Sequence, residues 1–160
     1  MELETGYYYH IYNRSNNREI VYKEHSNYLL FLRKYREYLL DELPILAYCL
    51  MPTHFHMLAY VTGVDVSKIK KQIGILQSSY TKSINATYNR AGSLFQNHDK
   101  SKHIDDESYL ITVATYIHQN PVRAGLARIF HQEIFFSATP KAFGTRAKMG
   151  TQSPRKRSGR

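Results

Sequence analysis

The stretch Leu50-Met51-Pro52-Thr53-His54-Phe55-His56-Met57-Leu58 decides the fold, because it is an apolar run that carries two histidines two residues apart. Successive side chains of a β-strand point to opposite faces, so His54 and His56 share one face and Phe55 takes the other. Neutral imidazole is a common ligand of divalent metal ions, but two ligands rarely hold an ion. The pattern predicts either half of a metal site or two hydrogen-bonded histidines, and a third donor would decide between them.

On both sides of this stretch, the hydrophobic pattern alternates between the two-residue repeat of strands and the three-to-four-residue repeat of helices. The short break at Pro52-Thr53 favours an antiparallel hairpin or a bulged continuation. The order of elements matches an α+β fold of the ferredoxin-like, split βαβ type, with an antiparallel sheet and helices packed on one face. We predict strands at 6–14, 45–51, 54–61 and 93–96, helices at 24–41, from a cap at 65 or 67 to about 88, and from 105 to 120, and a polar basic loop at 97–103.

Length and composition bound the class of protein. A chain of 160 residues is one domain by length, and periodicity is lost after Phe136, so we predict a domain over 1–136 and a basic, disordered tail over 137–160. No apolar run approaches the ~18 residues of a membrane span, and the first residues lack a signal sequence, so we expect a cytoplasmic protein with no membrane partner. The single cysteine, Cys49, lies among apolar residues, which predicts a buried, inert thiol and excludes a disulfide framework.

The positive charge is unevenly distributed. The formal net charge is +9, and residues 137–160 carry seven basic residues and no acid. Most of the excess therefore lies in the predicted tail, where it would add salt-dependent affinity for nucleic acid that does not depend on sequence. The chain also has 14 tyrosines and no tryptophan. Tyrosine rings can stack on unpaired bases, although most tyrosines in a domain simply pack.

The last predicted helix supplies a candidate third donor. A step of about 100° per residue places Tyr116 and Asn120 one turn apart on one face, and His118 on roughly the opposite face. If the first of these faces meets His54 and His56, an amide oxygen and a phenol lie beside the two imidazoles. The alternative is that Tyr116 packs on the sheet and Asn120 only caps the end of the helix.

Four stretches of the chain carry a family resemblance. The two strongest are Met51-Pro52-Thr53-His54-Phe55-His56 and Tyr116-Ile117-His118-Gln119-Asn120-Pro121-Val122-Arg123-Ala124-Gly125-Leu126, and the two weaker ones are Tyr9-His10-Ile11-Tyr12-Asn13-Arg14 and Tyr88-Asn89-Arg90-Ala91-Gly92-Ser93-Leu94-Phe95-Gln96. In this order they resemble the REP-associated tyrosine transposases, within the single-tyrosine HUH endonuclease superfamily. One position departs from that pattern, because Thr53 stands where the family often has asparagine.

The resemblance implies a ferredoxin-like enzyme that cuts single-stranded DNA near hairpins and rejoins it in transposition, through a 5′-phosphotyrosine. It assigns Tyr116 as the nucleophile and His54, His56 and Asn120 as ligands of a divalent ion, either Mg²⁺ or Mn²⁺. The implied partners are single-stranded DNA or DNA hairpins. The implied location is the cytoplasm of a prokaryotic cell, where the protein would act at the nucleoid. A homodimer is compatible with this sequence but is not derivable from it.

Basic residues on several predicted elements are candidate DNA contacts, although a charged helix face is often only solvated. They are Arg14, Lys68, Lys71, Lys82, Arg90, Lys100, Lys102 and Arg123. Two other functions stay open at this point. One is a nicking enzyme of the rolling-circle type, and the other is a catalytically silent DNA-binding regulator of the same fold.

Overall fold

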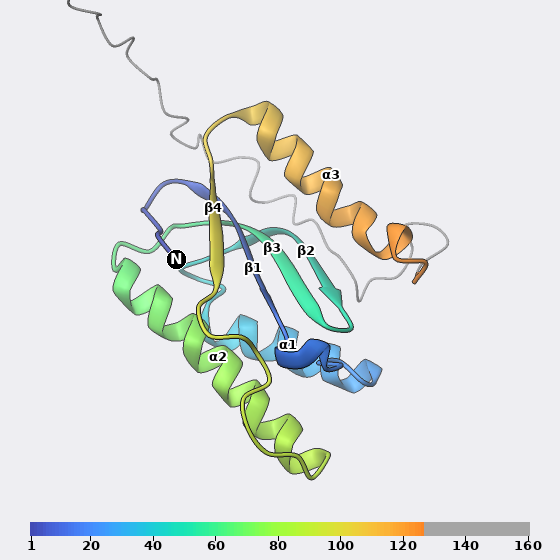
Figure 1. The fold of residues 1–160 in the computed structure, drawn as a ribbon. Coiled ribbons are helices and arrows are strands. Elements are labelled where there is room, and N and C mark those ends of the chain that lie inside the picture. Colours follow the sequence, from blue (N-terminus) through green and yellow to red (C-terminus); the bar gives the residue numbers. More distant parts are fainter. Residues whose placement is uncertain (127–160) are drawn as a thin grey trace, which may run out of the picture.

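The apolar stretch around the two histidines forms a hairpin of β2 (Ile45–Met51) and β3 (His54–Tyr60), and the sheet is built onto it. The computed structural model describes residues 1–126, so the predicted tail and the predicted domain end at 136 lie outside the described residues. Four antiparallel strands lie in the order β2-β3-β1-β4 (Figure 1). The other elements are β1 (Tyr8–Arg14), the 3₁₀ helix η1 (Asn16–Arg18), α1 (His25–Tyr38), α2 (Val66–Thr87), β4 (Lys100–Ile104) and α3 (Glu107–Arg123).

The position of β3 inside the sheet brings polar residues to the histidine pair. On one side β3 pairs with β2, with His54 opposite Met51. On its other side it pairs with β1, with His56 opposite Tyr12 and His54 opposite Arg14. Because the strands are antiparallel, the start of β3 lies beside the polar end of β1. The sheet therefore places the two histidines next to the chain segment that leaves β1.

Each face of the sheet has its own apolar core. Ile11 and Phe55 belong to the cluster that packs against α1 and α2, whereas Leu58 belongs to the cluster that packs against α3. Figure 1 shows α3 on the opposite side of the sheet from α1 and α2. The α+β class and the antiparallel sheet are confirmed, but the expected placement of all helices on one face needs this correction. All seven residues of β2 are buried, which is typical of a strand covered on both faces.

The fourth strand also differs in position from the prediction. Residues 93–96, predicted as a strand, make only an isolated bridge between Phe95 and Ser15, and β4 instead occupies part of the predicted loop at 97–103. β4 is an edge strand, and Lys100, Lys102 and His103 are exposed on it. Lysines on an edge strand discourage pairing with another chain. They also obscure the apolar alternation by which a strand is recognised in a sequence.

α3 continues past the proline that was predicted to end it. Pro121 lies inside the last turn, and the helix ends at Arg123. Proline has no N–H to donate, but helical hydrogen bonding continues beyond it, because the backbone N–H of Ala124 donates to the oxygen of Asn120 at 3.0 Å. Asn120 is therefore in the body of the helix. Among residues 1–126, no helix combines the length and hydropathy that crossing a bilayer requires.

Cys49 is expected to resist thiol reagents in the folded protein. It is 0% exposed, and burial raises the pKa of its thiol to about 12. At about pH 8 the reactive thiolate is then rarer than in a free cysteine by a factor on the order of 10³. We expect labelling by an aromatic disulfide reagent to be slower by at least about that factor in native buffer than in concentrated guanidinium chloride, measured by absorbance. Equal labelling rates in the two solvents would contradict the buried position.

Candidate active site

The two histidines of β3 form one side of the site. They lie on the face of the sheet that α3 covers, while Phe55 between them lies in the core of the opposite face. The centroids of the His54 and His56 rings are 5.2 Å apart, and the ring planes are nearly perpendicular at 85°. His56 is buried and His54 is half-buried. His54 is therefore the more accessible of the two.

α3 brings Tyr116 to this pair. Val113 and Ile117 are buried against the sheet, and their packing fixes the rotation of the helix about its axis. The centroid of the Tyr116 ring lies 5.5 Å from that of His56, with the rings edge to face at 81°. Tyr116 is 38% exposed, so a substrate can reach its phenol. The helix and the strand thus bring a phenol and an imidazole together from distant parts of the sequence.

One ring nitrogen of each histidine has a hydrogen-bond partner. The Nδ1 atom of His54 lies 3.1 Å from the Thr53 hydroxyl, and the Nδ1 atom of His56 lies 2.9 Å from Nε2 of His10. Such contacts fix the orientation of a metal-binding imidazole and leave its other nitrogen for the ion. For both histidines that other nitrogen is Nε2. Thr53, which departs from the family pattern, therefore makes a contact to the first histidine.

His10 belongs to the site, although sequence reasoning did not include it among the candidate site residues. Its ring centroid is 5.0 Å from that of His56 and 6.1 Å from that of Tyr116. The signal that could have found it is the alternation of β1, which puts His10 and Tyr12 on the same face. Once β1 is paired with β3, that face is the one that carries the two histidines.

Burial keeps the two inner histidines neutral. Burial, followed by the nearby His10 and His54 rings, lowers the pKa of His56 to about 3. Burial, followed by the positive charge of Lys102, lowers the pKa of His10 to about 4. Burial also lowers the pKa of His54. All three imidazoles are therefore uncharged at neutral pH, which is the form that binds metal ions.

Asn120 lies one turn after Tyr116 and offers an oxygen donor. Its Nδ2 donates to the backbone oxygen of Tyr116 at 2.9 Å, which leaves the side-chain oxygen as the acceptor. Within residues 1–126, no three His, Cys, Asp or Glu side chains are grouped so as to hold a metal ion. A metal site built on His54 and His56 needs a donor of another type, and a carboxamide oxygen suits a Mg²⁺ or Mn²⁺ ion.

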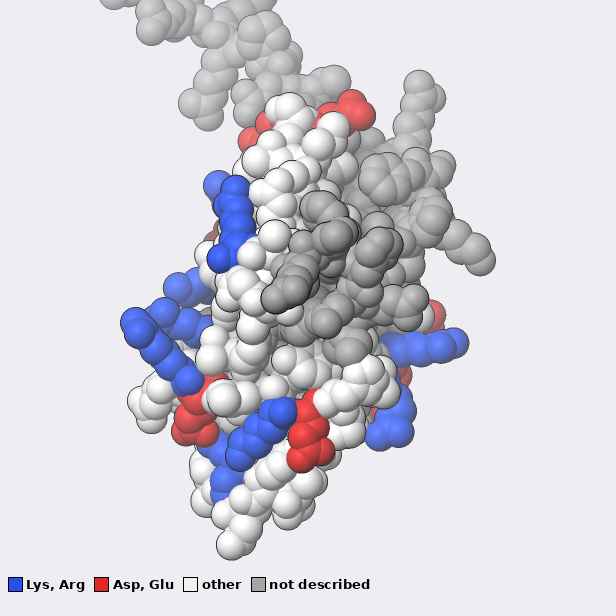
Figure 2. Space-filling view, turned by 90° about the vertical axis from the view of Figure 1, so that its right-hand side faces the viewer, with Lys and Arg blue, Asp and Glu red and all other residues white. Residues whose placement is uncertain are grey.

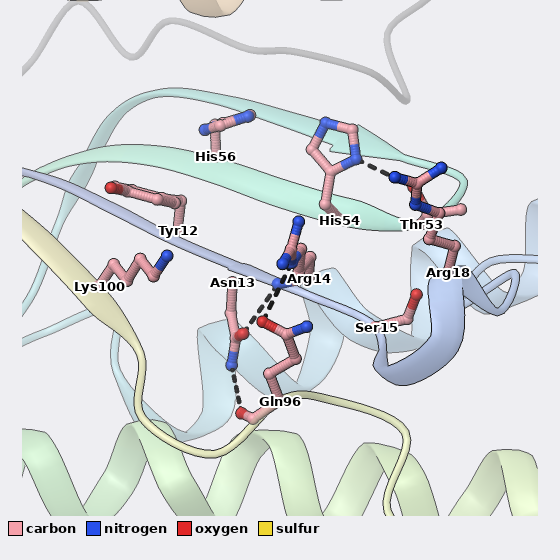
Figure 3. A pocket seen from close by; sticks show the side chains of 10 residues that line it. All are labelled: Tyr12, Asn13, Arg14, Ser15, Arg18, Thr53, His54, His56, Gln96 and Lys100. Atoms are coloured by element: carbon pink, nitrogen blue, oxygen red, sulfur yellow. Dashed lines mark hydrogen bonds between the residues drawn. The ribbon is translucent and has the colours of Figure 1, made fainter.

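A pocket of about 370 Å³ opens beside the histidine pair (Figure 3). Two of the predicted DNA contacts, Arg14 and Lys100, line it together with both histidines. Lys102 lines a neighbouring hollow with His56 and Tyr116. The ammonium group of Lys102 lies 4.6 Å from the centroid of the Tyr109 ring. Three of the basic residues that were predicted as DNA contacts therefore lie around the site.

The other predicted DNA contacts lie elsewhere or are already paired. Lys71 and Lys82 are exposed on α2, which covers the opposite face of the sheet from the histidines. Lys68, on the same helix, forms an ion pair with Glu42. Arg90 forms one with Glu19 at 2.8 Å and also bonds Asn85.

Figure 2 shows lysine and arginine side chains spread over one face of the molecule with acidic side chains among them. Arg123 is exposed at the end of α3, on the helix that carries Tyr116. The structure therefore brings Arg14, Lys100 and Lys102 to the site, and it does not bring the α2 lysines there.

Comparisons with known proteins give a family and a fold. A model of the family described as "Transposase IS200 like" matches residues 4–120. The solved structure of a REP-associated tyrosine transposase bound to a REP hairpin matches with a TM-score of 0.66 and 14% identity, covering 85% of this chain and 79% of that chain. A putative transposase from Deinococcus radiodurans R1 matches with a TM-score of 0.49 and 18% identity, covering 73% of this chain and 95% of that chain. No curated protein matches. The first structural match shows a shared fold.

Proposed function

We infer the function from one premise: this chain belongs to the IS200-like transposase family. We propose that it cuts and rejoins single-stranded DNA through a covalent bond to Tyr116, beside a divalent metal ion. The observation that carries the proposal is the approach of the Tyr116 ring to within 5.5 Å of the His56 ring, centroid to centroid. A nucleophile and a group of neutral metal-binding side chains are the two parts that this chemistry needs.

The proposed metal ligands are His54, His56 and the side-chain oxygen of Asn120. The Nδ1 contacts of both histidines and the backbone contact of Asn120 support this set, because each leaves one donor atom available. A bound Mg²⁺ or Mn²⁺ would neutralise charge on the scissile phosphate and accept its oxygens in the remaining coordination positions. With three protein ligands, those positions stay open to DNA.

Tyr116 is the proposed nucleophile. Its phenolic oxygen attacks the phosphorus, and the bond from phosphorus to the 3′-oxygen breaks. The products are a 5′-phosphotyrosine and a strand that ends in a 3′-hydroxyl. The phenol loses a proton and the departing oxygen gains one. Because Val113 and Ile117 hold α3 on the sheet, the phenol is positioned before the DNA arrives.

The covalent intermediate allows the strand to be rejoined. A 3′-hydroxyl can attack the phosphotyrosine, which forms a new phosphodiester bond and releases Tyr116. The energy of the original bond is kept in the intermediate, so strand transfer needs no nucleotide triphosphate. This property distinguishes a transposase from a nuclease that hydrolyses the phosphodiester bond with water.

We propose DNA hairpins with a short adjacent single strand as the substrate. The REP-associated transposase that shares this fold was solved bound to a REP hairpin. The basic residues around the site, Arg14, Lys100 and Lys102, are the proposed phosphate contacts near the cleavage position. Binding should therefore weaken as the salt concentration rises.

The test is a search for the covalent intermediate. The purified chain is incubated with labelled single-stranded hairpin oligonucleotides and Mg²⁺ or Mn²⁺, and the products are separated on a denaturing gel and weighed by mass spectrometry. The proposal predicts a metal-dependent adduct whose mass is that of the protein plus a DNA fragment. DNA that is cut without any adduct would point to hydrolysis by water and would contradict the proposed role of Tyr116.

A further inference from the structure

The pocket beside the histidines is built by segments that meet at the end of β1. Its lining comes from the last residues of β1, from η1, from the turn between β2 and β3, and from the chain that leads into β4 (Figure 3). Asn13 joins two of these segments, β1 and the chain that leads into β4, because its Nδ2 donates to the backbone oxygen of Gln96 and to the Asp99 carboxylate, each at 3.0 Å. The pocket is therefore a built part of the fold.

The lining is positively charged. Arg14, Arg18 and Lys100 contribute to it, and no acidic residue of the described chain does. Nε of Arg14 donates to the side-chain oxygen of Gln96 at 3.0 Å, which holds the guanidinium in place and leaves its terminal nitrogens for a ligand. A guanidinium held in this way suits a phosphate, which accepts two parallel hydrogen bonds.

Arg18 reaches the pocket from a strained turn. Asn17 and Arg18 have φ angles of 50° and 56°, in the left-handed region that side chains rarely adopt. Asn16 anchors the turn, because its backbone N–H donates to Leu94 and its Nδ2 to Phe95, each at 2.9 Å. Backbone strain of this kind is often kept where a side chain must hold a ligand.

Ser15 adds a polar group that lacks a partner. It is 1% exposed, it lines the pocket, and its hydroxyl makes no hydrogen bond within the described chain. Figure 3 shows this hydroxyl pointing from the end of β1 toward the side of Arg18 and Thr53. Buried hydroxyls are nearly always paired, so an unpaired one that borders a cationic pocket indicates a missing acceptor. A phosphate oxygen is such an acceptor.

Tyr12 offers an aromatic surface in the lining of the pocket, beside the histidines. Its ring centroid lies 5.7 Å from that of His56, and its side chain is half-buried. An unpaired base can stack on a tyrosine ring of this kind. The pocket therefore combines a phosphate-binding side with a base-stacking side, next to the proposed cleavage position.

We propose that this pocket binds one nucleotide of the single strand, adjacent to the phosphate that is cut. Arg14, Arg18 and the Ser15 hydroxyl bind its phosphate, and the base stacks on Tyr12. This inference rests on the proposed function, since it names how the same site holds its substrate. Arg18, Ser15 and Tyr12 were not among the DNA contacts predicted from the sequence.

The test measures binding without cleavage. The full chain carrying Tyr116→Phe is titrated, in the presence of EDTA, onto a fluorescent single-stranded oligonucleotide at several salt concentrations, and binding is followed by anisotropy. Adding Arg18→Asn keeps a residue that tolerates the left-handed conformation but removes the charge. We expect affinity to fall about tenfold and the slope of log K against log salt to flatten by about 0.7, as for one lost single-strand phosphate contact.

A matched control is Arg36→Asn, since Arg36 is exposed on α1, on the other face of the sheet. Equal affinities and salt slopes for the two variants would overturn the proposal. Removing single bases from the oligonucleotide adds a second readout. We expect one abasic position to weaken the binding of the oligonucleotide to the protein that keeps Tyr12, but not to the Tyr12→Leu variant. An equal loss of affinity in both proteins would exclude stacking.

Two further results distinguish this inference from a site for free nucleotides and from the proposed function itself. If a free deoxynucleoside monophosphate displaced the oligonucleotide at similar concentrations, the pocket would belong to free nucleotides and the proposal would fail. Adduct formation plays no part in these titrations, so a chain that never forms an adduct can still show the expected Arg18 effect. Conversely, an adduct that forms normally in an Arg18→Asn chain with unchanged DNA affinity would overturn the pocket alone.

Discussion

Replacing Tyr116 with phenylalanine is expected to abolish the covalent capture of single-stranded DNA while leaving hairpin binding nearly intact. The substitution removes only the phenolic oxygen, and the ring can keep its packing beside His56. Loss of the nucleophile should reduce adduct formation by at least about 10³-fold, as when other covalent catalysts lose theirs. The measurement is the fraction of labelled oligonucleotide that migrates with the protein on a denaturing gel.

Tyr38→Phe is the matched control for that experiment. Tyr38 is the last residue of α1, is partly buried and packs on the opposite face of the sheet from Tyr116. This variant should form the adduct at close to the normal rate. An adduct that survives in Tyr116→Phe would show that another group attacks the phosphate, and the assignment of the nucleophile would be wrong.

Replacing His56 with alanine is expected to remove metal-dependent cleavage. The variant loses a proposed metal ligand, so only the imidazole of His54 would remain to bind the ion. It also loses the hydrogen-bond partner of His10. We expect the cleavage rate at a fixed Mn²⁺ concentration to fall by on the order of 10³-fold, with weaker Mn²⁺ binding in calorimetry.

His25→Ala serves as the control for His56→Ala, because His25 is exposed at the start of α1 on the other face of the sheet. Thermal unfolding of both variants checks that the sheet still folds after a buried ring is removed. Undiminished cleavage in a folded His56→Ala protein would rule out the proposed site.

Local patterns in the sequence predicted the hairpin, the three helices and the shared face of the two histidines. The strand period decides which side chains lie together on β3, and the helical period decides that Tyr116 and Asn120 share a face of α3. Both are properties of a single element. They therefore need no knowledge of how elements pack.

Features that depend on the sheet were missed or misplaced. The position of α3 opposite α1 and α2 follows from a strand that is buried on both faces, which sequence periodicity alone does not separate from a buried helix. β4 was hidden by Lys100 and Lys102, because an edge strand keeps polar side chains. His10 entered the site only through the pairing of β1 with β3.

The most direct test of the account is the location of a bound metal ion. Crystals of the Tyr116→Phe chain, grown with a hairpin oligonucleotide and Mn²⁺, would give an anomalous difference map in which manganese is identified by its own anomalous scattering. The account predicts a peak within bonding distance of Nε2 of His54 and of His56 and beside the ring of residue 116. A manganese peak that contacts neither imidazole would contradict it.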